Sequence, residues 1–230
     1  MSAPIQQKLV DISGLTSKLL RKNFGRGPDS CNAFVNHRYL VFYIRGFLSP
    51  MEAILLANGN VDHINFSRNI VMKAVLANLQ GILELEFEQD VQDFYHDWNY
   101  VRNTGMITVV FEGNITLVNE ELEQFPERHP LIDEVERISA LIQKKPEKTD
   151  VYRISPKLYL VKRTGILIPL EKALIAKGYL QLLLETITDL EKSYYEPDGR
   201  FKDVFKQPIA DIFVDSNLIE DNSLACFVLR

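Results

Sequence analysis

The chain has few of the features that mark secreted, membrane-spanning or nucleic-acid-binding proteins. Its 230 residues include only two cysteines, Cys31 and Cys226, outside any Cys-x-x-Cys spacing, so neither a disulfide framework nor a zinc motif is indicated. The most apolar long stretch, residues 64–83, is interrupted by Arg68 and Lys73, which argues against a transmembrane helix. The net charge is −5, and an acidic protein is poorly suited to neutralising phosphates. We therefore expect a cytoplasmic globular protein with no transmembrane segment that binds no nucleic acid.

Motifs for catalysis are equally scarce. The chain has no Gly-x-Ser-x-Gly elbow and no phosphate loop, and its four histidines show no metal-ligand spacing. We accordingly expect no catalytic residue, no metal and no cofactor. A protein without enzymatic activity is favoured over an uncharacterised enzyme.

What the chain does contain is an internal repeat. Residues 45–59 match residues 164–178 without a gap, at a spacing of 119 positions. The identities are Gly46, Leu48, Pro50, Glu52, Leu55, Ala57 and Gly59, paired with Gly165, Leu167, Pro169, Glu171, Leu174, Ala176 and Gly178. Seven identities in a fifteen-residue window compare with about one expected by chance. The sequence therefore predicts a tandem duplication.

Each copy has the same predicted order of elements. In the first copy, apolar periodicity and turn signals predict helices over residues 6–23, 50–58 and 61–88 and strands over 31–36, 39–45, 91–98 and 106–112. The acidic last turns of the long helix favour an earlier end. The second copy shows corresponding segments at 131–143, 157–163, 169–177, 179–194, 209–215 and 224–229.

These elements predict an α+β fold made of two tandem α-β-β-α-α-β-β copies, each with an antiparallel sheet covered by helices on one face. The expected domains are residues 1–112 and 131–230, with a linker over 113–130. A duplicated chain is expected to pack as an intramolecular pseudo-dimer about a pseudo-two-fold axis, with its oligomeric state left open.

One combination of segments resembles a known family. The first helix ends in Gly25-Arg26-Gly27-Pro28, a strand runs into residues 45–52, and a hairpin arm carries His96-Asp97. Together they resemble the MpsC-like domain family, named after a component of a Na+-translocating, membrane-potential-generating system. The resemblance covers residues 5–112. The second copy departs from it, with Lys144-Lys145-Pro146-Glu147 at the turn and Val214 in place of the histidine.

The resemblance implies a soluble, non-catalytic accessory or regulatory protein associated with a membrane ion or inorganic-carbon (bicarbonate) transport system. Its partners would be proteins, with peripheral attachment at the inner face of the cell membrane left open. A small-ligand or anion sensor is the alternative, and an uncharacterised enzyme is the third reading.

The candidate ligand-binding residues are Gly25, Arg26, Gly27, His96 and Asp97. The glycines permit close backbone approach to an anion and Arg26 offers a forked donor, whereas the competing interpretation is a helix C-cap. An aspartate can orient a histidine for chemistry, but neighbours on a strand point to opposite faces, which favours a structural His96.

Charged residues at the helix ends have two interpretations each. Lys18, Arg21, Lys22 and Arg26 form a basic cluster that suits anionic lipid or an acidic partner, or simply a solvated face. Glu52 and Glu171 each lie just inside a helix start, where the helix dipole alone explains an acid.

Overall fold

The computed structural model describes residues 3–116, 124–195 and 199–230, with side chains from residue 5 onwards. The chain divides into two compact units, Met1–Leu117 and Val118–Arg230. Part of the expected linker, residues 117–123, lies outside the described residues. The domain bounds and the pseudo-dimer packing therefore stay predictions.

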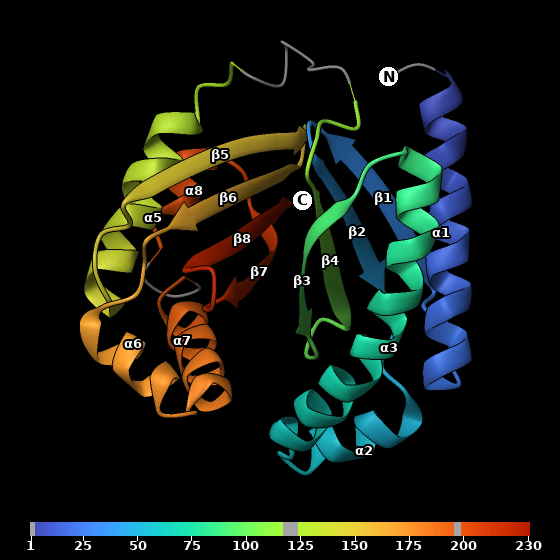
Figure 1. The fold of residues 1–230 in the computed structure, drawn as a ribbon, viewed down its shortest axis with the longest axis horizontal. Coiled ribbons are helices and arrows are strands. Elements are labelled where there is room, and N and C mark those ends of the chain that lie inside the picture. Colours follow the sequence, from blue (N-terminus) through green and yellow to red (C-terminus); the bar gives the residue numbers. More distant parts are fainter. Residues whose placement is uncertain (1–2, 117–123, 196–198) are drawn as a thin grey trace. The chain divides into compact units, whose positions relative to one another are not determined.

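The first unit is an antiparallel sheet with helices on one face. Its strands pair in the order β1-β2-β4-β3, and α1 and α3 lie together over the same face of this sheet (Figure 1). The elements are α1 (Ala3–Phe24), β1 (Ser30–Asn36), β2 (Tyr39–Arg45), α2 (Pro50–Ala57), α3 (Val61–Phe87), β3 (Val91–Asn99) and β4 (Thr104–Phe111).

The second unit repeats this topology. Its strands pair in the order β5-β6-β8-β7, so the α+β architecture and its duplication are confirmed. The elements are α5 (Arg128–Ile142), β5 (Lys148–Ser155), β6 (Leu158–Thr164), α6 (Pro169–Ala176), α7 (Leu180–Tyr195), α8 (Phe201–Phe205), β7 (Ile209–Asn217) and β8 (Asn222–Leu229). The repeat order predicted a strand at the place of β5, but its residues were not assigned because it begins with polar residues. Helix α8 was not predicted, since five residues are too few for helical periodicity to register.

Each core forms between the helices and alternate residues of the central strands. In β2, Leu40, Phe42 and Ile44 all face the helices and are fully buried, as the period of a strand requires. In α3, Leu79 and Leu83 are buried in the same core. Their burial keeps α3 helical to Phe87 despite its acidic last turns, because burying each leucine stabilises by about 1.5–3 kcal/mol, more than the helix dipole opposes. The predicted range of 61–88 is therefore confirmed to within one residue, and the earlier end that the acidic turns favoured was wrong.

The repeated glycine motif has a common structural cause. Gly46 adopts φ +67, a left-handed conformation that glycine accepts without strain, and its N–H donates to the carbonyl oxygen of Asn103 at 2.9 Å. The Asn103 Oδ1 then accepts the N–H groups of Phe47 and Leu48, both at 2.8 Å. The second unit repeats each contact with Gly165, Asp221, Ile166 and Leu167. The glycine therefore belongs to the turn that fixes the strand-to-helix exit in both units.

Candidate functional site

The Gly25 turn ends α1. Gly25 has φ +73 and follows the last helical residue, Phe24, which is the geometry of a glycine C-cap. Arg26 is exposed and its Nη2 lies 3.5 Å from the Asp29 Oδ1. A side chain at Gly27 would meet the Arg21 guanidinium, with its Cβ 2.8 Å from Nε. The cap interpretation accounts for Gly25, while anion binding by Arg26 and Gly27 stays a proposal.

His96 and Asp97 are neighbours on β3, paired with Ile107 and Met106 of β4. Burial lowers the pKa of His96 to about 4, Asp97 opposes the shift, and the positive charge of Arg68 adds to it. The imidazole is therefore neutral at pH 7. Asp97 Oδ1 accepts the N–H of Trp98 at 2.7 Å. The charge of Arg68, a residue that was not among the candidates, therefore acts on His96.

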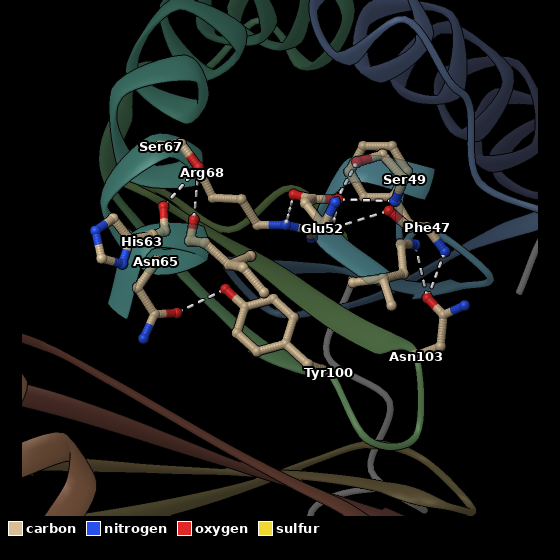
Figure 2. Close-up of polar contacts among 11 residues, drawn as sticks. Phe47, Ser49, Glu52, His63, Asn65, Ser67, Arg68, Tyr100 and Asn103 are labelled. Carbon is tan, nitrogen blue, oxygen red and sulfur yellow. Dashed lines mark hydrogen bonds and ion pairs between the residues drawn. The ribbon is translucent and has the colours of Figure 1, made fainter. Parts of the chain in front are cut away.

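Arg68 is the buried charged centre of the first unit. It lies on α3 and is 2% exposed, and it forms a bidentate ion pair with Glu52 on α2, with Nε–Oε1 at 2.7 Å and Nη2–Oε2 at 3.0 Å. Nη2 also donates to the carbonyl oxygen of Phe47 at 2.8 Å. Figure 2 shows these contacts where the two helices meet the end of β2. One guanidinium thus ties three segments together.

Aromatic rings surround the same guanidinium. Its Cζ lies 4.5 Å from the ring centroid of Trp98 and 4.9 Å from that of Phe47, within the range of cation–π attraction. Tyr100 and Phe24 complete the set at 5.3 and 5.7 Å. The Tyr100 hydroxyl donates to Asn65 Oδ1 at 2.6 Å (Figure 2). Arg68 therefore contacts both Phe24, the residue before the Gly25 turn, and Trp98, which lies two residues after His96 on β3.

Glu52 is held ionised by its contacts. Burial by itself would raise the pKa of Glu52, but hydrogen bonds from Arg68 and Ser49 and the charge of Arg68 hold that pKa below its usual value. Its Oε2 also accepts the Ser49 N–H at 2.8 Å, while Ser49 Oγ accepts the N–H of Glu52 at 3.3 Å, a complete capping box. The dipole interpretation of Glu52 was therefore incomplete, since its main partner is Arg68.

The second unit places its buried ion pair elsewhere. Arg163 on β6 is fully buried and forms a bidentate pair with Glu191 on α7, with Nη2–Oε2 at 2.8 Å. Ser139 Oγ accepts from Arg163 Nη1 at 3.0 Å, and Ser223 Oγ accepts from Nη2. Glu171, the counterpart of Glu52, is bound by Gln143 Nε2 at 2.9 Å and by the Ile168 N–H at 2.9 Å.

These arrangements do not resemble a reaction centre. Arg68 and Arg163 have little contact with solvent, and each guanidinium is paired with a carboxylate. In the described parts of the chain, no group of three His, Cys, Asp or Glu residues could hold a metal ion. Among the described helices, none is long and apolar enough to cross a membrane. Arg68, Glu52 and the aromatic rings around the guanidinium, which we call the Arg68 cluster, can fix α2, α3 and the end of β2 against one another.

The comparisons with known proteins identify a family for the first half of the chain. Residues 5–113 match the model of the family described as "Na+-translocating membrane potential-generating system (MpsC)", which confirms the resemblance over the first half of the chain. No curated protein and no solved structure matches. The Arg68 cluster lies within the matched residues, and the Arg163 pair lies outside them.

Proposed function

We propose that this protein, whose residues 5–113 match the MpsC family model, is a non-catalytic accessory component of a membrane system that translocates Na+ and generates a membrane potential. It works through contacts with a protein subunit of that system. The observation that carries this proposal is an apolar surface on α3, inside the matched residues.

That surface is a continuous strip along the helix, which we call the α3 stripe. Phe66, Ile70 and Leu85 are 69%, 55% and 84% exposed, although burial is the usual state of such side chains. Together with three small residues between them, they recur at steps of three and four residues, which places all six on one helix face. The full stripe is Phe66, Ile70, Ala74, Ala77, Gly81 and Leu85, all exposed.

The second unit shows that the fold does not require this apolar strip. At the positions equivalent to Phe66, Ile70 and Ala74, α7 carries Glu185, Asp189 and Ser193, which are also exposed. A polar sequence thus serves the same helix equally well. An exposed apolar patch that the fold does not need is typical of a binding surface.

The shape of the stripe favours a helix as the contacting element. Large side chains stand at its ends, whereas Ala74, Ala77 and Gly81 form its middle. Small residues at this spacing let the backbone of another helix approach closely. We assign this role to a helix of a protein subunit of the Na+-translocating system that the family description names.

The test is complementation of a strain that lacks the protein. The wild-type chain should restore a Na+-dependent membrane potential, measured with a potential-sensitive dye, whereas Phe66→Glu/Ile70→Glu should not. The matched control is Glu185→Lys/Asp189→Lys on α7, which alters the equivalent face and should complement fully. Unchanged melting temperatures for both purified variants exclude misfolding as the cause.

The same strains distinguish the remaining expectations. A deletion that leaves the Na+-dependent potential intact would refute the proposed function. Uptake of labelled bicarbonate by these strains tests whether the system carries inorganic carbon. Loss of uptake in the α3 variant but not in the α7 control would support inorganic-carbon transport.

A further inference from the structure

The last turns of α1 carry an exposed basic cluster. Lys18, Arg21 and Lys22 are separated by three and four residues, so they lie on one side of the helix. Arg26 follows directly after the Gly25 cap, and all four side chains belong to exposed residues. The three helical members span about 6 Å along the axis, at 1.5 Å per residue. We call it the α1 basic patch.

Within the part of the chain that the structure describes, the patch has little neutralisation. Lys18, Arg21 and Lys22 form no ion pair there, and Arg26 reaches only the exposed Asp29, at 3.5 Å. The helix dipole favours Arg21 and Lys22 in the last turn. It does not account for Lys18, whose spacing of four residues from Lys22 is repulsive.

The second unit differs at the matching place. The counterparts of Arg21 and Lys22 are Ala140 and Leu141. The counterparts of Lys18 and Arg26 are cations that have partners: Arg137 pairs with Glu134 at 2.7 Å, and Lys145 pairs with Glu136 at 2.9 Å. The fold therefore does not require unpaired cations at this helix end.

Two apolar side chains are exposed on α1 before the patch, Leu15 three residues and Val10 eight residues before Lys18. Val10 is 65% exposed and Leu15 is 39% exposed. Basic residues next to exposed apolar ones are the composition of surfaces that lie at a membrane interface. A nucleic acid would use the cations alone, and a small free anion would need converging donors rather than four exposed side chains along a helix.

We propose that the α1 basic patch docks the first unit on the anionic surface of a lipid bilayer. Lys18, Arg21, Lys22 and Arg26 contact lipid headgroups, and Val10 and Leu15 meet the boundary between headgroups and acyl chains. This surface is separate from the α3 stripe, which contacts protein. Because the protein as a whole has a net charge of −5, binding depends on the local patch and weakens with salt.

The test uses the purified full chain and sedimentation with vesicles. Vesicles of phosphatidylglycerol and phosphatidylcholine in equal parts should bind the wild-type protein, and pure phosphatidylcholine vesicles should not. Each basic residue near an anionic surface strengthens binding about five-fold. Lys18→Gln/Arg21→Gln/Lys22→Gln should therefore bind roughly 100-fold more weakly. Raising the ionic strength from about 0.1 M to about 1 M, which shortens the Debye length from about 10 Å to about 3 Å, should release the wild-type protein.

The control removes three other exposed cations: Lys177→Gln/Lys202→Gln/Lys206→Gln, on the second unit. It makes the same change in net charge and should bind vesicles as the wild type does. Equal weakening of both triple variants, or wild-type protein that ignores anionic vesicles, would overturn the proposal. Because no transport partner is present in this assay, its failure leaves the complementation result for the α3 stripe unaffected.

Discussion

The two units share one topology but bury their charges at different positions. In the first unit the ion pair joins Arg68 and Glu52, and the position equivalent to Arg68 in the second unit is Ile187, which packs in an apolar cluster. In the second unit the pair joins Arg163 and Glu191, and the equivalent residues of the first unit are Ile44 and Met72, both buried in its core.

The surroundings have changed together with each pair. Around the Arg68 position, Phe47, Trp98 and Tyr100 correspond to Ile166, Ser216 and Leu218 of the second unit. Around the Arg163 position, Ser139 and Ser223 correspond to Leu20 and Gly105 of the first. Gly105 leaves the space that the Trp98 ring fills. The fold therefore accepts a buried arginine at either place, provided that a carboxylate and its other partners accompany it.

The largest expected effect is the loss of Arg68. Arg68→Ile supplies the residue type of the second unit but leaves Glu52 buried without its partner, which should cost about 3–5 kcal/mol of unfolding free energy. Adding Glu52→Gln removes the stranded charge and should recover part of that loss. Urea denaturation of the full chain measures both. If the double variant is as unstable as the single one, the unpaired charge of Glu52 does not explain the loss of stability.

The reciprocal exchange tests the second unit. Arg163→Ile alone should cost about 3–5 kcal/mol, because Glu191 is fully buried. Arg163→Ile/Glu191→Met installs the residues that the first unit has at these positions. Its free energy of unfolding should be at most about 2 kcal/mol below that of the wild type, or higher than it. Ser139 keeps its hydrogen bond to the Val135 carbonyl at 2.8 Å. A double variant that loses as much as the single one would show that the two cores are not interchangeable.

The pH dependence of stability should separate the units further. His96 has a folded pKa of about 4 against an ordinary 6.5, so the unfolded chain binds its proton first. The contribution of neutral His96 to the free energy of unfolding is fully present above pH 6.5 and is lost as the pH falls to about 4. The resulting decrease in stability is on the order of 3 kcal/mol. His96→Val, the residue type of Val214, should remove this decrease. Superimposable pH profiles for the wild type and the variant would contradict a buried neutral imidazole.

The smallest effect concerns the turn after the first helix of each unit. Arg26→Ala should change the stability by less than about 0.5 kcal/mol, as exposed substitutions usually do, and Lys145→Ala should have no measurable effect. If the Gly25 turn binds an anion, Arg26→Ala alone should weaken that binding by about 1.5–3 kcal/mol. Melting curves with added phosphate or bicarbonate compare the variants, and equal responses would leave the turn as a helix cap.

The predictable part of the fold came from local patterns. The apolar run over residues 39–45, the helix start at residue 50 and the Gly25 stop are all properties of adjacent residues. The 119-residue spacing linked the two copies without any structural knowledge. The candidate site was only partly predictable: Gly25 was recognised as a helix end and His96 as a structural residue candidate, whereas Arg68 appeared merely as an interruption of an apolar stretch.

The sequence by itself thus determined the duplication, the order of elements and the family resemblance of the first half, because each depends on residues close in the chain or at one fixed spacing. Only the tertiary structure decided which charges are buried. Arg68 finds its partners 16 and 21 positions away, and Arg163 binds residues 28 and 60 positions away. A charge is stable inside a protein only when groups from several separate elements pair with it at once. Local sequence patterns do not predict which distant residues will come together in this way.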